Sequence, residues 1–223
     1  MWQRIKRFCV EGYELFKVFL QTMHAFWRFT KLHEPMVTIF GGALVAGESE
    51  FNKKAFELAH KLMHANITVL TGGGAGIMHA ASCGAVPHEK GEIRSVGIGV
   101  TKFSERRNEC VQEYIELSYF FTRKLLLIRF SSAFIVFPGG LGTLDELTEI
   151  LQLFDAHELG RVPIVLVGVE YWDYFMKWVK QSSEKDGLIS KDEMELFIIT
   201  DDIETVFSLV RDECLRSAQQ KIN

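Results

Sequence analysis

The sequence of 223 residues has few cysteines, no excess of positive charge and no long apolar run. The formal net charge of −4 and the pI near 6.0 argue against a nucleic-acid-binding protein that relies on a basic surface. No stretch offers about 18 uninterrupted apolar residues, so we expect no integral membrane segment. The four cysteines form no Cys-x-x-Cys pair and no metal-like cluster, which predicts free thiols in a cytoplasmic protein. They are Cys9, Cys83, Cys110 and Cys214.

The N-terminal segment 1–35 differs in charge from the rest. It holds six Lys/Arg and three acids, a net charge of +3, so residues 36–223 carry −7. Basic residues followed by apolar ones resemble a signal peptide. Glu11, Glu14 and Lys17 interrupt the apolar run, however, and no small-residue cleavage site follows.

Apolar residues in this segment recur at spacings of three and four, from Ile5 and Phe8 to Phe26 and Trp27. This pattern predicts one or two amphipathic helices. Pro35 ends it, and we expect two parts, a helical extension over 1–35 and a main domain over 36–223. The apolar face is expected to pack on its own domain or on a dimer mate. The alternative is docking to a membrane surface or to another partner.

Beyond Pro35, short apolar runs alternate with helical patterns. Continuous runs of this kind are typical of a parallel sheet covered on both faces. The sequence therefore predicts an α/β fold, a Rossmann-like, doubly wound parallel sheet. Core strands are expected at 37–40, 67–70, 95–100, 133–137, 164–167 and 196–199, with an extended segment at 114–120. Helices are expected at 51–62, 77–85, 123–130 and 143–157. A further helix is expected to begin at 171, and a final one to end near 215.

The segment Phe134–Glu146 carries the clearest functional signal. An apolar strand runs into Pro-Gly-Gly-x-Gly-Thr and then into a helical pattern. Glycines let the backbone approach a ligand closely, and the first N–H groups of a helix favour an anion such as phosphate. A second glycine loop, Gly72–Gly76, also follows a strand. Alone it could be a tight turn, since it is neither G-x-G-x-x-G nor a Walker A sequence, but two such loops at strand ends favour phosphate binding.

Two charged residues have an alternative structural interpretation. Thr143-x-x-Glu146 fits a capping box, in which Glu146 would bond the N–H of Thr143. Arg123 could be an ordinary surface arginine. It falls near the predicted start of a helix, however, where a cation is unfavourable, and contact with a substrate phosphate or with Glu146 would explain that position.

Three motifs resemble the LOG family, once called "lysine decarboxylase-like". They are Thr71–Met78, the run Phe121-Thr122-Arg123-Lys124, and Pro138-Gly-Gly-x-Gly-Thr-x-x-Glu146. The resemblance extends from about Met36 to about Val210. It implies hydrolysis of the N-glycosidic bond of a nucleoside 5′-monophosphate, of the AMP or cytokinin-ribotide type, by a homodimer with its active site near the interface.

The resemblance also implies the site. Glu146 is expected to act on the oxocarbenium-like ribose or on the attacking water, and Arg123 to stabilise charge and orient groups. Expected phosphate and substrate contacts are Gly72, Gly73, Gly74, Gly76, Ile77, Met78, Lys124, Gly139, Gly140, Gly142 and Thr143. We expect no cofactor and no metal, since His60 and His64 have helical i, i+4 spacing but no third ligand.

The chain departs from the family pattern at four positions. Ala75 and His79 stand where relatives often have proline and glutamate, and Gly42 and Leu44 stand where they tend to have serine and arginine. A different substrate range is one consequence. Two rival functions remain open, a non-catalytic nucleotide or phospho-cofactor carrier like the related molybdenum-cofactor carriers, and a decarboxylase, which would normally need a lysine Schiff base with pyridoxal phosphate.

Overall fold

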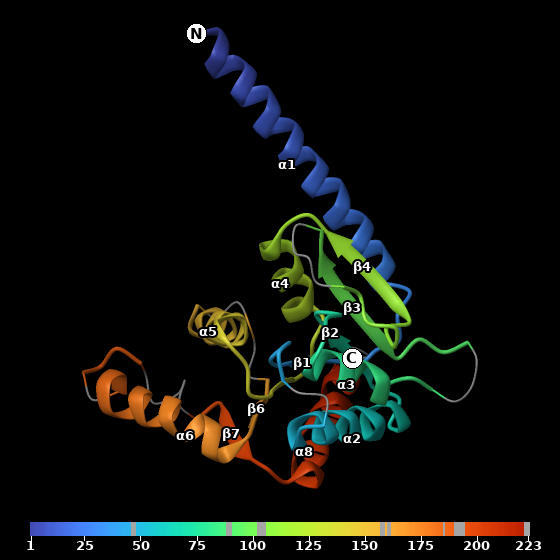
Figure 1. Cartoon of the computed structure of the whole chain (residues 1–223), viewed down its shortest axis with the longest axis vertical. Helices are drawn as coiled ribbons and strands as arrows, with labels where there is room; N and C mark the ends of the chain where they lie inside the picture. The colour runs from blue at the N-terminus through green and yellow to red at the C-terminus, as the bar shows by residue number, and fades with distance from the viewer. Residues whose placement is uncertain are drawn as a thin grey trace.

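The computed structural model describes residues 1–45, 48–87, 91–101, 106–156, 159, 162–184, 186–189 and 195–220. Within these residues the strands form one parallel sheet in the order β4-β3-β2-β1-β5-β6-β7 (Figure 1). Their bounds are β1 (Met36–Phe40), β2 (Thr68–Thr71), β3 (Ser95–Val100), β4 (Glu113–Leu117), β5 (Phe134–Val136), β6 (Ile164–Val167) and β7 (Phe197–Thr200).

Helices cover both faces of the sheet. They are α1 (Trp2–Phe29), α2 (Glu50–His64), α3 (Ile77–Gly84), α4 (Phe120–Arg129), α5 (Leu141–Asp155), α6 (Val169–Trp178), the π-helix η1 (Val179–Glu184) and α8 (Ile203–Gln220). Side chains of β1 alternate between the two resulting cores. Met36 and Phe40 pack with the end of α1 and with α4, α5 and α6, whereas Val37 and Ile39 pack with α2, α3 and α8. The predicted doubly wound α/β fold is confirmed.

Several predicted boundaries are wrong by a few residues. The segment expected to be extended over 114–120 divides into β4 and the first residue of α4, which begins at Phe120 instead of Arg123. Helix α5 begins at Leu141 instead of Thr143, and its predicted end at His157 lies outside the described residues. Helix α8 continues to Gln220, beyond the predicted end near Leu215.

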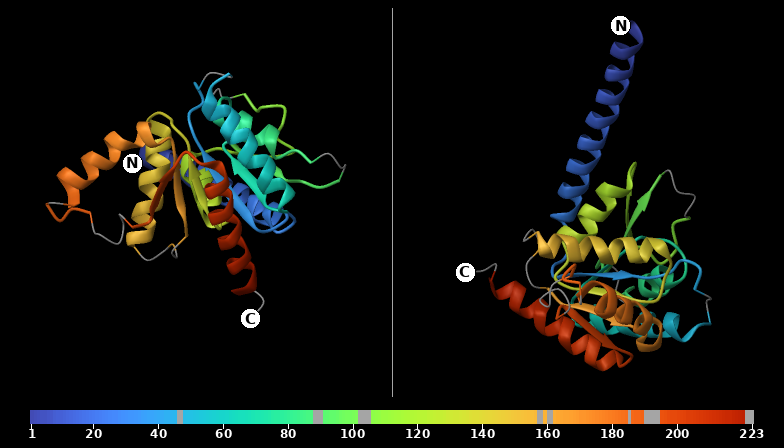
Figure 2. Two further views of the ribbon diagram at one scale, coloured as in Figure 1. Left: turned by 90° about the horizontal axis from the view of Figure 1, so that it is seen from below. Right: turned by 90° about the vertical axis from the view of Figure 1, so that its left-hand side faces the viewer.

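Helix α1 is a single helix that stands out from the domain (Figures 1 and 2). Its last turns dock beside β4 and α4. Arg28 Nε donates to Glu113 Oε1 at 2.8 Å, Arg28 Nη2 donates to the carbonyl of Tyr114 at 2.8 Å, and the ring of Phe29 stacks on Phe130. The N-terminal part extends away from these contacts. No helix among the described residues is both long and apolar enough to cross a bilayer.

Candidate active site

The sheet has its topological switch point between β1 and β5. From there the strand order runs outward to β4 on one side and to β7 on the other, so the connections leave in opposite directions and open a crevice at the carboxyl ends. A cleft of about 780 Å³ lies there. Its lining includes Gly41, Gly42, Ala43, Leu44, Gly72, Met78, Phe120, Arg123, Lys124, Pro138, Gly139, Gly140, Gly142, Thr143, Asp145, Glu146 and Tyr171.

The N-terminus of α5 forms one wall of this cleft. Gly140 is its N-cap residue, and among the described residues no side chain caps it. The first N–H groups of the helix have no intrahelical partner and carry the positive end of its dipole. Gly42 N–H donates to the Pro138 carbonyl at 3.0 Å, and a Cβ on Gly139 would lie 2.8 Å from that nitrogen. Glycine at 139 therefore lets the loops after β1 and β5 meet.

Arg123 and Glu146 meet in the cleft. Arg123 Nη2 donates to Glu146 Oε1 at 3.2 Å, and the two side chains are only 7% and 13% exposed. The residues are 23 positions apart in sequence. They meet because Arg123 lies in the first turns of α4 and Glu146 in the first turns of α5, and both helices begin at the carboxyl edge of the sheet.

The capping-box interpretation of Glu146 is wrong. Helix α5 begins two residues before Thr143, so Thr143 lies inside the first turn, where it is buried. The turn is already closed at Gly140, whose carbonyl accepts hydrogen bonds from the N–H groups of Thr143 and Leu144. Glu146 reaches across to Arg123 instead. The interpretation of Arg123 as a surface arginine is also wrong, because its side chain is buried.

Lys124 lies beside the pair on α4. Its Nζ contacts Asp145 at 3.0 Å and Glu149 at 2.5 Å. Burial lowers the pKa of Lys124, but hydrogen bonds from its ammonium group to Glu149 and Asp145 outweigh this effect and raise the pKa above its usual value. Lys124 is therefore a permanent cation at the cleft, next to the acids of α5.

The glycine loop Gly72–Gly76 enters the cleft only in part. Gly72 and Met78 line it, whereas Gly73, Gly74, Gly76 and Ile77 do not. Gly73, Gly74 and Ile77 have other contacts. The backbone N–H of Asn108 donates to the Gly73 carbonyl at 3.0 Å, its Nδ2 donates to the Gly74 carbonyl at 2.9 Å, and Ile77 N–H donates to the Gly42 carbonyl at 3.2 Å. The N-terminus of α3 is thus turned toward the loop after β1.

Gly72 sets the position of Arg123. A Cβ on Gly72 would lie 2.5 Å from Arg123 Nη2 and 2.7 Å from Met78 Sδ. Real Cβ atoms almost never come this close, so any other residue at 72 would displace the guanidinium group or the thioether. The glycine therefore contributes by leaving room for the arginine.

Two residues at the site were not found from sequence. The hydroxyl of Tyr171 donates to the Gly139 carbonyl at 2.5 Å and so holds the loop before α5. Its position just after β6, at the carboxyl edge, was the available signal. Asn108, buried behind the glycine loop Gly72–Gly76, belongs to no sequence motif, and no feature of the sequence indicated it.

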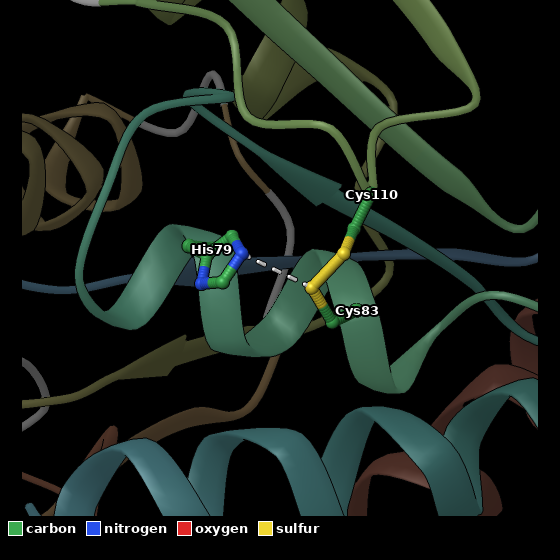
Figure 3. Close-up of side chains that lie close together, drawn as sticks. All are labelled: His79, Cys83 and Cys110. Atoms are coloured by element: carbon green, nitrogen blue, oxygen red, sulfur yellow. Dashed lines mark hydrogen bonds between the residues drawn. A yellow bond between two sulfur atoms is a disulfide. The ribbon is translucent and has the colours of Figure 1, made fainter. Parts of the chain in front are cut away.

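The prediction of four free thiols is wrong for two of them. Cys83 on α3 and Cys110, which precedes β4, form a disulfide (Figure 3), while Cys9 and Cys214 are free. The two half-cystines are 27 positions apart, a spacing that belongs to no recognisable pattern. They meet because the segment before β4 passes beside α3. The disulfide therefore ties the segment that carries Asn108 to the helix after the glycine loop.

His79 lies beside the disulfide. Its Nε2 is 3.3 Å from Cys83 Sγ (Figure 3). The same nitrogen is 3.2 Å from Glu109 Oε1. The nitrogen and both sulfurs lie within 4.8 Å of one another, which corrects the prediction that no cysteine joins a metal-like cluster. The thiolate is the form that ligates metals, and in the disulfide both sulfurs are oxidised. In this state the group offers a metal only the imidazole.

Comparison with known proteins identifies the family. The family model described as "possible lysine decarboxylase" matches residues 78–210, more than half of the chain and both Arg123 and Glu146. The chain belongs to this family, the LOG family. Among curated relatives, LOG-family proteins named cytokinin riboside 5′-monophosphate phosphoribohydrolase are 28% identical in Arabidopsis thaliana, over 72% of this chain and 75% of that one, and 29% identical in Oryza sativa subsp. japonica, over 73% and 66%.

Solved structures with the same fold include carriers. The molybdenum cofactor carrier protein of Chlamydomonas reinhardtii matches with a TM-score of 0.58 and 20% identity, over 81% of this LOG-family chain and 98% of its own. The molybdenum cofactor binding protein of Rippkaea orientalis matches with a TM-score of 0.56 and 19% identity, over 85% and 98%. At these identities the likeness shows the fold alone.

Proposed function

We propose that the chain hydrolyses the N-glycosidic bond of a nucleoside 5′-monophosphate, of the AMP or cytokinin-ribotide type, to the free base and ribose 5-phosphate. One observation carries the proposal, the buried Arg123–Glu146 pair beside the uncapped N-terminus of α5. The relatives named for this reaction, at 28% to 29% identity, support the same assignment.

The substrate phosphate is assigned to the N-terminus of α5. The loop Gly139–Gly142 leaves the backbone N–H groups accessible, and the helix dipole favours an anion there. Lys124 of α4, which is paired with Asp145 and Glu149 of α5, adds a cation beside this wall. With the phosphate held there, the ribose would extend along the cleft toward Glu146. The phosphate then contributes binding energy at a point remote from the reacting carbon.

The chemistry requires charge stabilisation and a proton acceptor. The bond between C1′ and the base nitrogen breaks, the base leaves with the electron pair and takes up a proton, and C1′ develops oxocarbenium character. Water attacks C1′ and gives up a proton. Glu146, ionised beside Arg123, stabilises the positive charge and accepts the proton from water.

Arg123 acts on the carboxylate. A guanidinium group stays protonated at physiological pH and is a poor proton donor, so it holds Glu146 ionised and oriented. The Phe120 ring, 5.6 Å from the guanidinium carbon, and Gly72 limit where the guanidinium group can lie. Rigid placement of this kind is what a reacting carboxylate needs.

A substrate panel tests the reaction. The purified protein is incubated with AMP, a cytokinin ribotide, adenosine, other nucleotides and lysine, and products are separated by chromatography. We expect a free base and ribose 5-phosphate from AMP or the ribotide, and turnover of adenosine slower by about a hundredfold, the loss of a few charge-assisted hydrogen bonds. Equal rates on AMP and adenosine would rule out the phosphate assignment.

The carrier alternative makes a different prediction. A carrier needs the cleft and its anion site, and it has no use for a buried carboxylate that opposes phosphate binding. Calorimetry on the same panel separates the two functions. Tight nucleotide or cofactor binding with no released base over many hours would favour the carrier, and carbon dioxide released from lysine would favour the decarboxylase.

A further inference from the structure

Helix α1 exposes its apolar side and buries the opposite one. At about 100° per residue, all of its exposed large apolar side chains except Val10 fall on an arc of about 160°. Ten of them, each more than half exposed, define the apolar face: Trp2, Ile5, Phe8, Tyr13, Leu15, Phe16, Phe19, Leu20, Met23 and Trp27. The buried residues Val18, Ala25 and Phe29 share the other side. The expectation that this face packs on its own domain is therefore not met by this chain.

This exposed surface is unusually large. Aromatic side chains present about 150–250 Å² each, and the largest apolar patch on a typical monomer covers about 300–600 Å². The ten side chains of the apolar face, all on one side of one helix, exceed that range. Patches of this size mark sites of protein–protein or membrane interaction.

The helix is held rigidly at its C-terminal end. Arg28 is bonded to Glu113 and to the backbone of Tyr114, and Phe29 stacks on Phe130 at 4.2 Å between ring centroids. At this end Met23 and Trp27 of the apolar face border a cavity with Arg129 and Phe130 of the domain. The N-terminal part of the helix stands clear of the domain (Figure 2). The N-terminal part of the apolar face is thus open to an external surface.

Charge distinguishes between possible occupants. By helical geometry Lys6 and Lys17 flank one edge of the apolar face and Arg4 flanks the other, while Glu11 and Glu14 lie on the far side. Basic residues beside an aromatic-rich apolar arc are typical of helices that lie in a membrane interface. The arc is also wider than the narrow seam that two paired helices require.

We propose that α1 docks the protein on the surface of an anionic lipid bilayer, with the apolar face buried at the headgroup level and Arg4, Lys6 and Lys17 contacting lipid phosphates. The helix lies along the surface and does not cross the bilayer. The proposal is independent of the proposed reaction, because it rests on α1 alone.

Vesicle co-sedimentation of the full chain tests the proposal. We expect binding to phosphatidylcholine vesicles with about 30% phosphatidylglycerol to be at least about tenfold stronger than to pure phosphatidylcholine, given the contribution of each cation near an anionic surface. High salt should weaken it. The double variant F16E/L20E, on the apolar face, should lose at least about tenfold in binding.

A matched control carries the same change in charge. Q3E/V10E places two acids on the polar side of the same helix, so any difference from F16E/L20E reports the apolar face. Circular dichroism and thermal melting check that both variants fold. Equal binding by the two variants, or no binding by the wild type, would overturn the proposal. So would sedimentation data showing a wild-type dimer that F16E/L20E alone dissociates, in the absence of vesicle binding, because the occupant would then be a second copy.

Discussion

The ion pair between Arg123 and Glu146 is the decisive feature at the scale of single residues. Both side chains are almost fully buried, so the ion pair offsets part of the cost of removing each charge from water. In a family member without catalysis, such a pair would cost desolvation energy at the floor of the proposed anion-binding cleft. The proposed reaction gives the pair a role.

Glu146→Gln separates catalysis from structure. Glutamine keeps the size of the side chain and can still accept a hydrogen bond from Arg123, so we expect the protein to fold. Losing the carboxylate should lower kcat by at least roughly a hundredfold. Nucleotide affinity should persist or tighten, because a negative charge near the phosphate is removed. Turnover, calorimetric affinity and Tm are measured on one preparation, and near-normal turnover in a folded variant would revive the carrier function.

Gly72→Ala tests the space that Arg123 occupies. The new Cβ would lie 2.5 Å from Arg123 Nη2, so the guanidinium must shift and its bond to Glu146 must lengthen. We expect a loss of about 1–3 kcal/mol in stability from overpacking. The kinetic defect should resemble that of Arg123→Lys, which keeps the charge but loses the planar fork. Wild-type kcat in Gly72→Ala would show that Arg123 tolerates displacement and has no orienting role.

At the scale of elements, strands could be predicted far better than helix starts. Buried parallel strands are continuous apolar runs, and 95–100 and 164–167 were predicted to the residue. Helix α5 begins at Leu141 because its first turn is closed at Gly140. Threonine at 143 looked like a cap because the first N–H groups of any helix are unpaired, so the sequence leaves the starting residue weakly determined.

Apart from the contact of Arg123 with Glu146, contacts between distant segments were not predicted. Asn108, which is more than 30 positions away, donates hydrogen bonds to the carbonyls of Gly73 and Gly74 in the glycine loop after β2. The disulfide between Cys83 and Cys110 likewise depends on the segment before β4 lying beside α3. Periodicity describes one element at a time and does not report which loops meet.

The disulfide should stabilise the segment around Asn108 and, through it, the glycine loop. In the chain-entropy estimate, closing a loop of this length contributes about 3–4 kcal/mol. We expect reduction with dithiothreitol, or Cys83→Ser, to lower Tm and to speed amide hydrogen exchange over residues 71–78 and 106–111. Cys83→Ser supplies the internal control, since added reductant should not change it further. Exchange in wild type that is indifferent to reductant would contradict this coupling.

For the whole molecule, the central relation is between α1 and the domain. The periodicity of residues 1–35 correctly predicted an amphipathic helix, but it could not show which side the domain covers, because that depends on where the last turn docks. Only the C-terminal part of α1 contributes to the core, through Ala25 and Phe29. The predicted homodimer remains a prediction, and α1 is one surface on which it can be tested.

Two truncations divide α1 by function. Deleting residues 1–17 removes no buried side chain, so Tm should change by less than about 2 °C, AMP cleavage should persist, and solubility should rise as most of the apolar face is lost. Deleting residues 1–33 also removes the stacking of Phe29 on Phe130 and the ion pair of Arg28 with Glu113. Burial of such an aromatic side chain contributes about 1.5–3 kcal/mol, so Tm should fall by at least about 3 °C, with aggregation. Calorimetric melting and sedimentation velocity compare the two, and equal behaviour would mean that the docked turn of α1 adds nothing to the stability of the domain.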